Sequence, residues 1–111
     1  MFLPVFFLFL RPSPLQAELL VHAIDVGYGE ATVLQQRHVG EPDRVVLVDA
    51  GPLESSGTLR FWLKEADIGA IDAVFITHPH PNHYEGLRVL SESLRIRKVY
   101  WPGSTAPEPE L

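Results

Sequence analysis

The segment that most restricts the fold and chemistry of this chain is residues 77–83, which read THPHPNH directly after the apolar run of residues 71–76. It holds three histidines, His78, His80 and His83, at spacings of two and three. Neutral imidazole is the commonest side-chain ligand for metal ions in proteins. Three histidines between a predicted strand and a predicted helix therefore indicate a metal site. The simpler alternative is a proline-rich turn with surface histidines.

The two prolines of this loop favour a backbone conformation in which two histidines can bind the same metal ion. His78 precedes Pro79 and His80 precedes Pro81, and a residue before proline is biased toward an extended backbone. Side chains at positions i and i+2 of an extended segment point the same way. We therefore expect His78 and His80 to face one ion, with His83 available to a neighbouring ion.

Asn82 has two interpretations. With Glu85 three residues later, it is predicted to cap the following helix in a capping box. As a metal ligand it would offer a neutral amide oxygen, which binds a cation more weakly than a carboxylate does. The two remaining histidines, His22 and His38, have no second ligand beside them and are not predicted to bind metal.

The chain after residue 17 predicts one α/β or α+β domain with a sheet of about five strands and two helices. Short apolar or β-branched runs between turns predict strands at residues 19–24, 31–35, 45–48, 71–76 and 98–101. Apolar residues at helical spacing predict helices through Leu59, Trp62, Leu63 and Ala66 and through Tyr84, Leu87, Leu90 and Leu94. The continuous apolar pattern of residues 71–76 predicts burial on both faces of that strand.

Composition excludes some functions. With 111 residues the chain has room for one core. A net charge of −5 with scattered basic residues provides no surface for tight nucleic-acid binding, so a polyanionic substrate would need metal ions to hold it. Because cysteine is absent, His, Asp and Asn are the available metal ligands.

The two ends of the chain differ from the middle. Residues 1–17 are predicted to be a signal peptide, with an apolar run at residues 2–10 and Ala17 at the cleavage site. That run is far shorter than the roughly 20 residues of a membrane-spanning helix, so no permanent anchor is expected. Secreted or periplasmic localisation follows, or a cytoplasmic one if the segment is only an apolar tail. Residues 18–103 would form the domain, and residues 104–111 are predicted to be disordered.

Several segments together resemble the metallo-β-lactamase superfamily of zinc hydrolases. THPHPNH is similar to its T-H-x-H-x-D-H signature, residues 24–31 (IDVGYGEA) to its D-V-G-x-G-D/E-A segment, and residues 46–51 (VLVDAG) to its apolar-D-x-G motif. The likeness covers residues 18–103 and is strongest to the hydrolase domain of ComEC-type competence proteins. It implies the N-terminal half of an αββα sandwich.

The resemblance also implies roles for individual residues. His78 and His80 would hold a first zinc ion, and His83 with Asn82 a second. The family has aspartate at the position of Asn82, so the second ion would be held more weakly here. Asp49 would orient the metal loop, and Asp25 would lie near it. The alternative is structural: Asp49 would be an aspartate at the end of a strand and Asp25 would form a turn, and neither would need a metal.

The function implied is metal-dependent hydrolysis by activated water, with phosphodiester or nucleic-acid substrates suggested by the competence-protein likeness. The family's later ligands, two histidines and a bridging aspartate, have no counterpart in the 111 residues. We therefore expect a truncated chain with little activity alone, which needs a complementary chain to complete the fold. The alternatives are a non-catalytic metal-binding or partner-docking module and an inert fragment.

Overall fold

The computed structural model describes residues 17–103. The predicted tail lies outside the described residues, and so does the predicted signal peptide except for Ala17, which begins the first strand. Along the chain the elements are β1 (Ala17–Ala23), β2 (Thr32–His38), β3 (Glu41–Val48), the 3-10 helix η1 (Leu53–Ser55), α1 (Ser56–Glu65), β4 (Ala70–Ile71), β5 (Ala73–Phe75), α2 (Pro81–Ser93), β6 (Arg95–Ile96) and β7 (Val99–Tyr100). No helix among these residues is long and apolar enough to cross a membrane.

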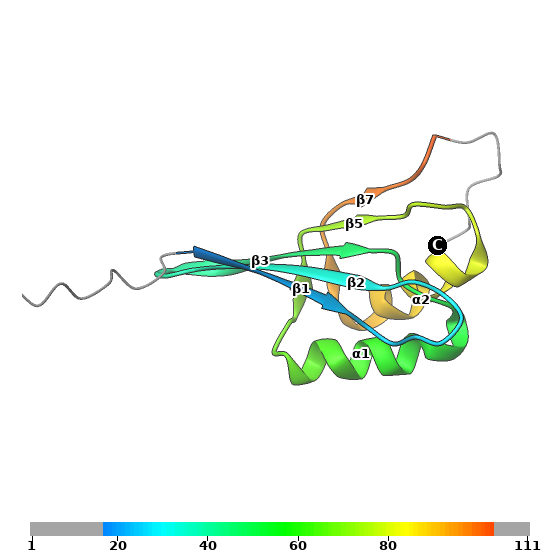
Figure 1. Cartoon of the computed structure of the whole chain (residues 1–111), viewed down its shortest axis with the longest axis horizontal. Helices are drawn as coiled ribbons and strands as arrows, with labels where there is room; N and C mark the ends of the chain where they lie inside the picture. The colour runs from blue at the N-terminus through cyan, green and yellow to red at the C-terminus, as the bar shows by residue number, and fades with distance from the viewer. Residues whose placement is uncertain (1–16, 104–111) are drawn as a thin grey trace, which may run out of the picture.

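Five strands form the main sheet, in the order β1-β2-β3-β5-β7. The pairs β1–β2 and β2–β3 are antiparallel, whereas β3–β5 and β5–β7 are parallel. Both helices lie on one side of this sheet (Figure 1). The predicted fold class, a mixed sheet of about five strands with two helices, is therefore confirmed.

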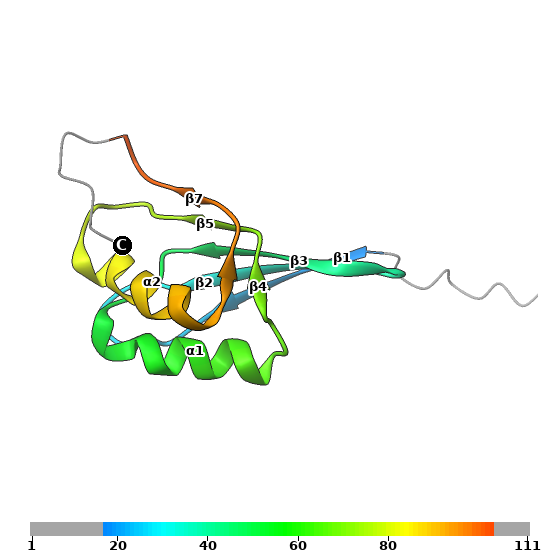
Figure 2. The ribbon, with the colours of Figure 1, turned by 180° about the vertical axis from the view of Figure 1, so that it is seen from behind.

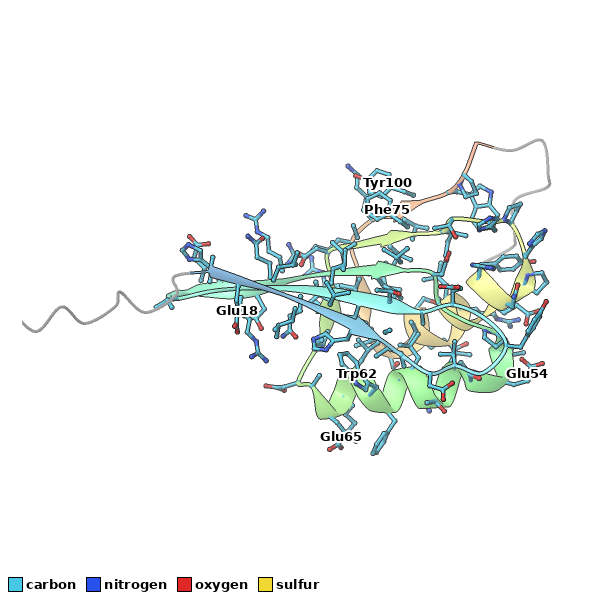
Figure 3. All side chains as sticks on the ribbon, in the orientation of Figure 1. Glu18, Glu54, Trp62, Glu65, Phe75 and Tyr100 are labelled. Atoms are coloured by element: carbon cyan, nitrogen blue, oxygen red, sulfur yellow. The ribbon has the colours of Figure 1, made fainter. Side chains whose placement is uncertain are left out.

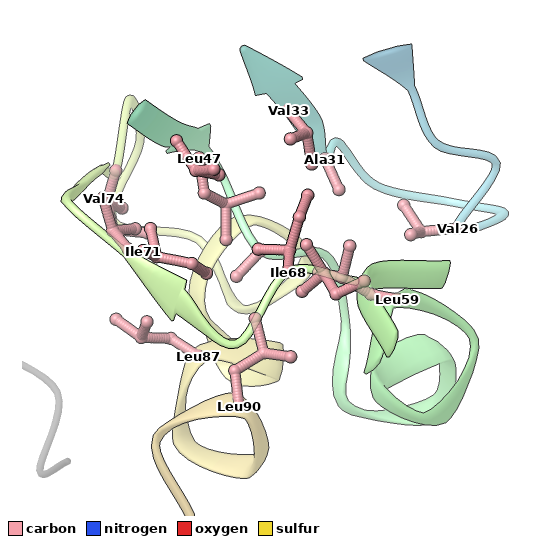
Figure 4. Close-up of a cluster of buried hydrophobic side chains, with 14 residues drawn as sticks. Val26, Ala31, Val33, Leu47, Leu59, Ile68, Ile71, Val74, Leu87 and Leu90 are labelled. Atoms are coloured by element: carbon pink, nitrogen blue, oxygen red, sulfur yellow. The ribbon is translucent and has the colours of Figure 1, made fainter. Parts of the chain in front are cut away.

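The core lies between the sheet and the helices (Figure 4). Each helix contributes two leucines that are at most 1% exposed: Leu59 and Leu63 from α1, and Leu87 and Leu90 from α2. Their partners on the sheet include Val33, Leu47 and Val74, all with no exposed surface. Burial of each such side chain contributes about 1.5–3 kcal/mol. This packing fixes the helix side of the sheet, and within residues 17–103 no helix covers the other side.

The strand predicted at residues 71–76 is interrupted at Asp72. Its backbone N–H donates to the carbonyl of Val45, and its carboxylate accepts the N–H of Val45, both at 2.8 Å. The chain turns there, so β4 pairs with β6 in a separate two-stranded sheet and only β5 joins the main one. Seen from behind in Figure 2, β4 runs at a steep angle to β5.

The prediction of burial on both faces of this segment is wrong for Phe75, which is 42% exposed. Its neighbours Val74 and Ile76 are buried. The helices cover only one face of the sheet, so alternate side chains of β5 remain uncovered.

The capping prediction for Asn82 is also wrong. Helix α2 begins at Pro81 with His80 as its N-cap, which places Asn82 inside the first turn. Proline is favoured at the first helical position because it has no N–H to leave unpaired there. Glu85 instead accepts the backbone N–H of Leu53 at 3.3 Å and so joins α2 to η1.

Candidate metal centre

The loop between β5 and α2 gathers the three predicted histidines. Ring centroids of His78 and His83 lie 4.9 Å apart, those of His78 and His80 6.0 Å, and those of His80 and His83 6.4 Å. The extended backbone of His80 and the start of α2 at Pro81 bring His83 back toward His78 within one helical turn. Local backbone geometry therefore places the three rings near one another.

Asp49, at the end of β3, anchors this loop. It is 3% exposed and has a positive φ of 59°, a conformation that aspartate tolerates better than most residues. One carboxylate oxygen accepts the backbone N–H of Thr77 at 2.8 Å. The other accepts the hydroxyl of Thr77 and Nδ1–H of His83, the latter at 2.8 Å. The backbone N–H of Ala50 donates to the carbonyl of His83 at 2.7 Å.

These contacts define which ring nitrogens are free. The single hydroxyl hydrogen of Thr77 is donated to Asp49, so Nδ1 of His78, 2.9 Å from that hydroxyl oxygen, must be the donor to it. His83 likewise donates through Nδ1 to the carboxylate. In its neutral form each ring therefore carries its lone pair on Nε2, as in metal-ligating histidines whose other nitrogen donates a hydrogen bond to a neighbouring oxygen.

The donor set, three imidazoles, fits a zinc ion in chemistry. Zn–N bonds of about 2.0–2.1 Å in a tetrahedral site place neighbouring imidazole centroids about 5 Å apart. The 4.9 Å between the centroids of His78 and His83 matches this value, whereas the centroid of His80 lies farther from both, at 6.0 and 6.4 Å. Within residues 17–103, however, no group of three or more His, Cys, Asp or Glu side chains converges as a finished metal site. The loop thus supplies clustered imidazoles and still requires further ligands.

Asn82 contacts the glycine-rich loop after β1 through its backbone. Its carbonyl oxygen accepts the N–H of Glu30 at 3.4 Å, and a Cβ on Gly29 would lie only 2.6 Å from that oxygen. Asp25 shapes the same loop, since its Oδ1 accepts the N–H of Gly27 at 3.0 Å. Asp25 therefore acts first as a turn former and reaches the histidine loop indirectly, through Gly29.

The two histidines not predicted as ligands lie elsewhere. Nε2 of His22 lies 3.3 Å from Oε1 of Gln35, and its ring packs at 4.8 Å from that of Trp62. His38 lies at the hairpin between β2 and β3, near Glu41.

Two features beside the loop were missed by the sequence analysis. Thr77 connects Asp49 to His78, and its position directly before the first histidine was the only signal available. Trp101 packs edge-on against Tyr84 at 5.5 Å, and its indole nitrogen is buried without a hydrogen-bond partner among residues 17–103. Tyr84 directly follows His83, so this aromatic pair lies next to the candidate ligands.

A pocket of about 350 Å³ adjoins Asn82. Its lining combines Tyr28, from the glycine-rich loop, with the two carboxylates Glu54 and Glu85. No Lys or Arg lines it. The space next to the histidine loop is therefore acidic.

The sequence motifs agree with a comparison to protein families. A model of the metallo-beta-lactamase superfamily matches residues 24–107. Among solved structures, the chain is similar to a candidate metallo-beta-lactamase from Thermotoga maritima, with 28% identity and a TM-score of 0.42, over 73% of this chain and 41% of that one. The chain thus spans less than half the length of that protein. A search of curated proteins found no significant match. Because the family match includes most of the chain, with the mixed sheet and two helices of the N-terminal half of the fold, this protein belongs to the metallo-beta-lactamase superfamily.

Proposed function

We propose that this protein is a zinc-dependent hydrolase domain whose metal ligands include His78, His80 and His83. The observation that carries the proposal is the pair of hydrogen bonds that the Asp49 carboxylate accepts from the hydroxyl of Thr77 and from Nδ1–H of His83. These contacts occupy Nδ1 of His83 and, through the Thr77 hydroxyl, Nδ1 of His78. Nε2 of each ring stays available to a metal ion. Zinc bound there would supply a Lewis acid and an activated water for hydrolysis.

The chain's own residues would act by positioning. Asp49 and Thr77 hold the rings of His83 and His78, so little side-chain entropy is lost when a metal binds. The first turn of α2, starting at Pro81, directs the positive end of the helix dipole toward the same loop, which favours an anionic group of the substrate.

The side chain of Asn82 supports a site in which one metal ion binds more tightly than a second. Its amide lacks the negative charge that a carboxylate at this position would contribute to a second dication. We therefore propose that one zinc ion is bound tightly and that a second, near His83 and Asn82, binds weakly.

For the substrate we propose a phosphodiester, by likeness of residues 24–31 and 77–83 to the ComEC-type hydrolase domain. The pocket beside Asn82 carries Glu54 and Glu85 and no cation. A phosphodiester would therefore depend on the metal for its electrostatic attraction. The apolar run at residues 2–10 supports export from the cytoplasm, which N-terminal sequencing of the exported protein tests.

Zinc content of the purified protein tests the site. Wild type is expected to retain zinc that a His78→Ala/His80→Ala variant loses. His38→Ala, at a hairpin away from the loop, is the matched control and should bind as wild type does. Equal zinc content in wild type and the double variant would refute the proposal.

Catalysis is tested with an aryl phosphodiester and a chromogenic β-lactam, before and after chelation. Chelator-sensitive cleavage of the phosphodiester supports the proposed substrate. Zinc binding without turnover of either compound would instead support the second candidate, a non-catalytic metal-binding module, which is favoured by Asn82 and by the absence of a converged three-ligand site among residues 17–103.

A further inference from the structure

The outer edge of β1 is the longest unpaired strand edge among residues 17–103. β1 pairs with β2 at seven consecutive positions without a bulge, and it lies at one edge of the main sheet. β7, at the opposite edge, has only two residues. Proteins usually protect a sheet edge with lysine, proline or a bulge, and Ala17–Ala23 contains none of these. The edge of β1 is therefore suited to pairing with a further strand.

Alternate residues of β1 direct their backbone N–H and C=O groups away from β2. The N–H of Ile24 donates to the carbonyl of Ala31 at 2.9 Å, in the register of the β1–β2 pair. Inward and outward backbone groups alternate along an antiparallel strand. The backbone groups of Leu20, like those of Ile24, therefore point toward β2. Those of Leu19 and Val21 point outward at the edge, where a further strand can reach them.

The side chains of β1 form a pattern that is similar in both directions. The strand reads AELLVHA, with an alanine at each end and Leu20 in the centre. Leu19 and Val21 flank the centre, and Glu18 and His22 lie one position farther out. An antiparallel second copy with its two-fold axis at Leu20 thus places apolar opposite apolar and carboxylate opposite imidazole. Moving the axis by one residue in either direction would put Glu18 or His22 opposite Leu20.

We propose that β1 pairs with β1 of a second copy of this chain, antiparallel and about a two-fold axis at Leu20, so that one sheet continues across two molecules. The outward backbone groups of Leu19 and Val21 form the hydrogen-bonded pairs. Leu20 faces Leu20 of the second copy in a non-hydrogen-bonded pair. The axis makes every other contact twice.

The shape of the molecule leaves room for this pairing. At its Ala17 end β1 extends beyond α1 (Figure 1). In Figure 3 Glu18 lies on this projecting part, whereas Trp62 of α1 lies under the other end of β1, with its ring 4.8 Å from that of His22. In an antiparallel pair the second copy has its own α1 at the opposite end of β1. The two α1 helices are therefore offset along the strands.

The charged groups around the edge are compatible with this register. Glu18 lies 3.5 Å from Arg37, which lies 3.7 Å from Asp43. Nε2 of His22 is 3.3 Å from Oε1 of Gln35, and the amide nitrogen of Gln35 donates to Asp43 at 2.8 Å. His22 therefore donates through Nε2, and its Nδ1 is left to meet Glu18 of the second copy. Glu18 then has a basic group on each side, Arg37 in its own copy and His22 across the axis.

The pairing of two strand edges is a small interface. The outward groups supply up to about eight backbone hydrogen bonds across the axis. Two paired edges bury less surface than a standard protein–protein interface. We therefore expect a reversible dimer with a dissociation constant of roughly 10–100 µM.

Sedimentation of the purified protein from about 1 to 500 µM tests for this dimer. Wild type should shift from monomer to dimer. His22→Glu places two carboxylates opposite each other on both sides of the axis and should raise the dissociation constant by about tenfold. Glu18→Lys/His22→Glu restores opposite charges across the axis and should return the constant close to that of wild type. Circular dichroism establishes that both variants are folded, and both should keep the zinc content of wild type.

Cysteine cross-linking tests the register, because the chain contains no cysteine. In a non-hydrogen-bonded pair the Cα atoms lie about 4.5 Å apart, within the range of a disulfide. Leu20→Cys should therefore give a disulfide-linked dimer under mild oxidation. Leu19→Cys is the matched control, because Leu19 is 63% exposed and Leu20 is half-buried. In the proposed register the two copies of residue 19 are about 8.5 Å apart, too far for a disulfide, whereas random collision would cross-link residue 19 faster.

Three results would overturn the inference. The first is a wild type that is monomeric throughout, as expected if residues 1–16 or another polypeptide pair with β1. The second is an oligomer that His22→Glu leaves intact or that the double charge variant fails to restore. The third is cross-linking of Leu19→Cys as efficient as that of Leu20→Cys.

Discussion

The carboxylate of Asp49 and Nδ1 of His83 lie 2.8 Å apart across 34 positions of sequence, with side chains only 4% and 14% exposed. This contact joins the end of β3 to the first turn of α2. A partly buried hydrogen bond to a carboxylate orients the ring before any ligand arrives.

Replacement of Asp49 by Asn is expected to lower zinc affinity by about 10- to 100-fold, the usual cost of losing a group that holds a ligating histidine. Asparagine keeps the size of the side chain and tolerates the positive φ at this position. Competition with a chromophoric chelator measures the change. Unchanged affinity would show that Asp49 is only a structural residue of the strand end.

Loss of the Thr77 hydroxyl should weaken zinc binding by about tenfold, less than loss of Asp49, because only the ring of His78 depends on it. The test compares Thr77→Val, which removes the hydroxyl, with Thr77→Ser, which keeps it. Chelator competition should find the serine variant close to wild type. An equal loss of zinc affinity in both variants would mean that packing of the threonine methyl group, and not the hydroxyl, supports zinc binding.

Asn82→Asp should raise the zinc stoichiometry at saturating metal from about one ion toward two, because it restores a negative ligand to the weaker site. Titration calorimetry and metal analysis measure the number of ions bound. Asn82→Gln, which changes the length of the amide but adds no charge, is the control. A stoichiometry that stays the same in the aspartate variant would contradict the proposed second site.

Gly86 is predicted to be essential for packing of α2 against the loop after β3. A Cβ there would lie well inside van der Waals contact with the carbonyl oxygen of Ala50, so Gly86→Ala should destabilise the fold by about 1–3 kcal/mol. Gly57 is also helical and has no atom within 4 Å of a built Cβ. Gly57→Ala should stabilise by about 0.4–1 kcal/mol.

Urea denaturation measures both glycine variants. Equal effects of the two substitutions would mean that helix propensity, rather than the contact with Ala50, determines the result.

Much of the fold and of the candidate site follows from local pattern. The apolar runs that became β1, β2 and β3 and the helical spacing of Leu59, Leu63, Leu87 and Leu90 predicted these elements correctly. Residues of β2, β3 and the two helices face the core at the period of their element. Strand β1, none of whose residues is buried, was predicted from its apolar run alone. The histidine cluster was predicted for a similar reason. Residues 78–83 are close in sequence, so strand, turn and helix geometry already places their rings near one another, before Asp49 orients them.

The errors occurred where distant residues compete with local preference. Asp72 interrupts an apolar run because both its backbone and its carboxylate bond to Val45, 27 positions away. Asn82 is not the N-cap because Pro81, directly before it, suits the first position of the helix. The helix therefore begins at Pro81, and His80 is the N-cap. Strand β6 was not predicted, because only its pairing with β4 in the folded chain identifies it as a strand.

By itself the sequence determined the element types, the histidine loop and the membership of a metal-binding superfamily, because each depends on residues that are neighbours along the chain. Only the tertiary structure decided which nitrogens the histidines expose and which face of the sheet stays uncovered. Both depend on contacts between distant segments: Asp49 with Thr77 and His83, and the helices with one side of the strands. Burial and hydrogen bonding between such segments are properties of the folded chain that no local pattern records.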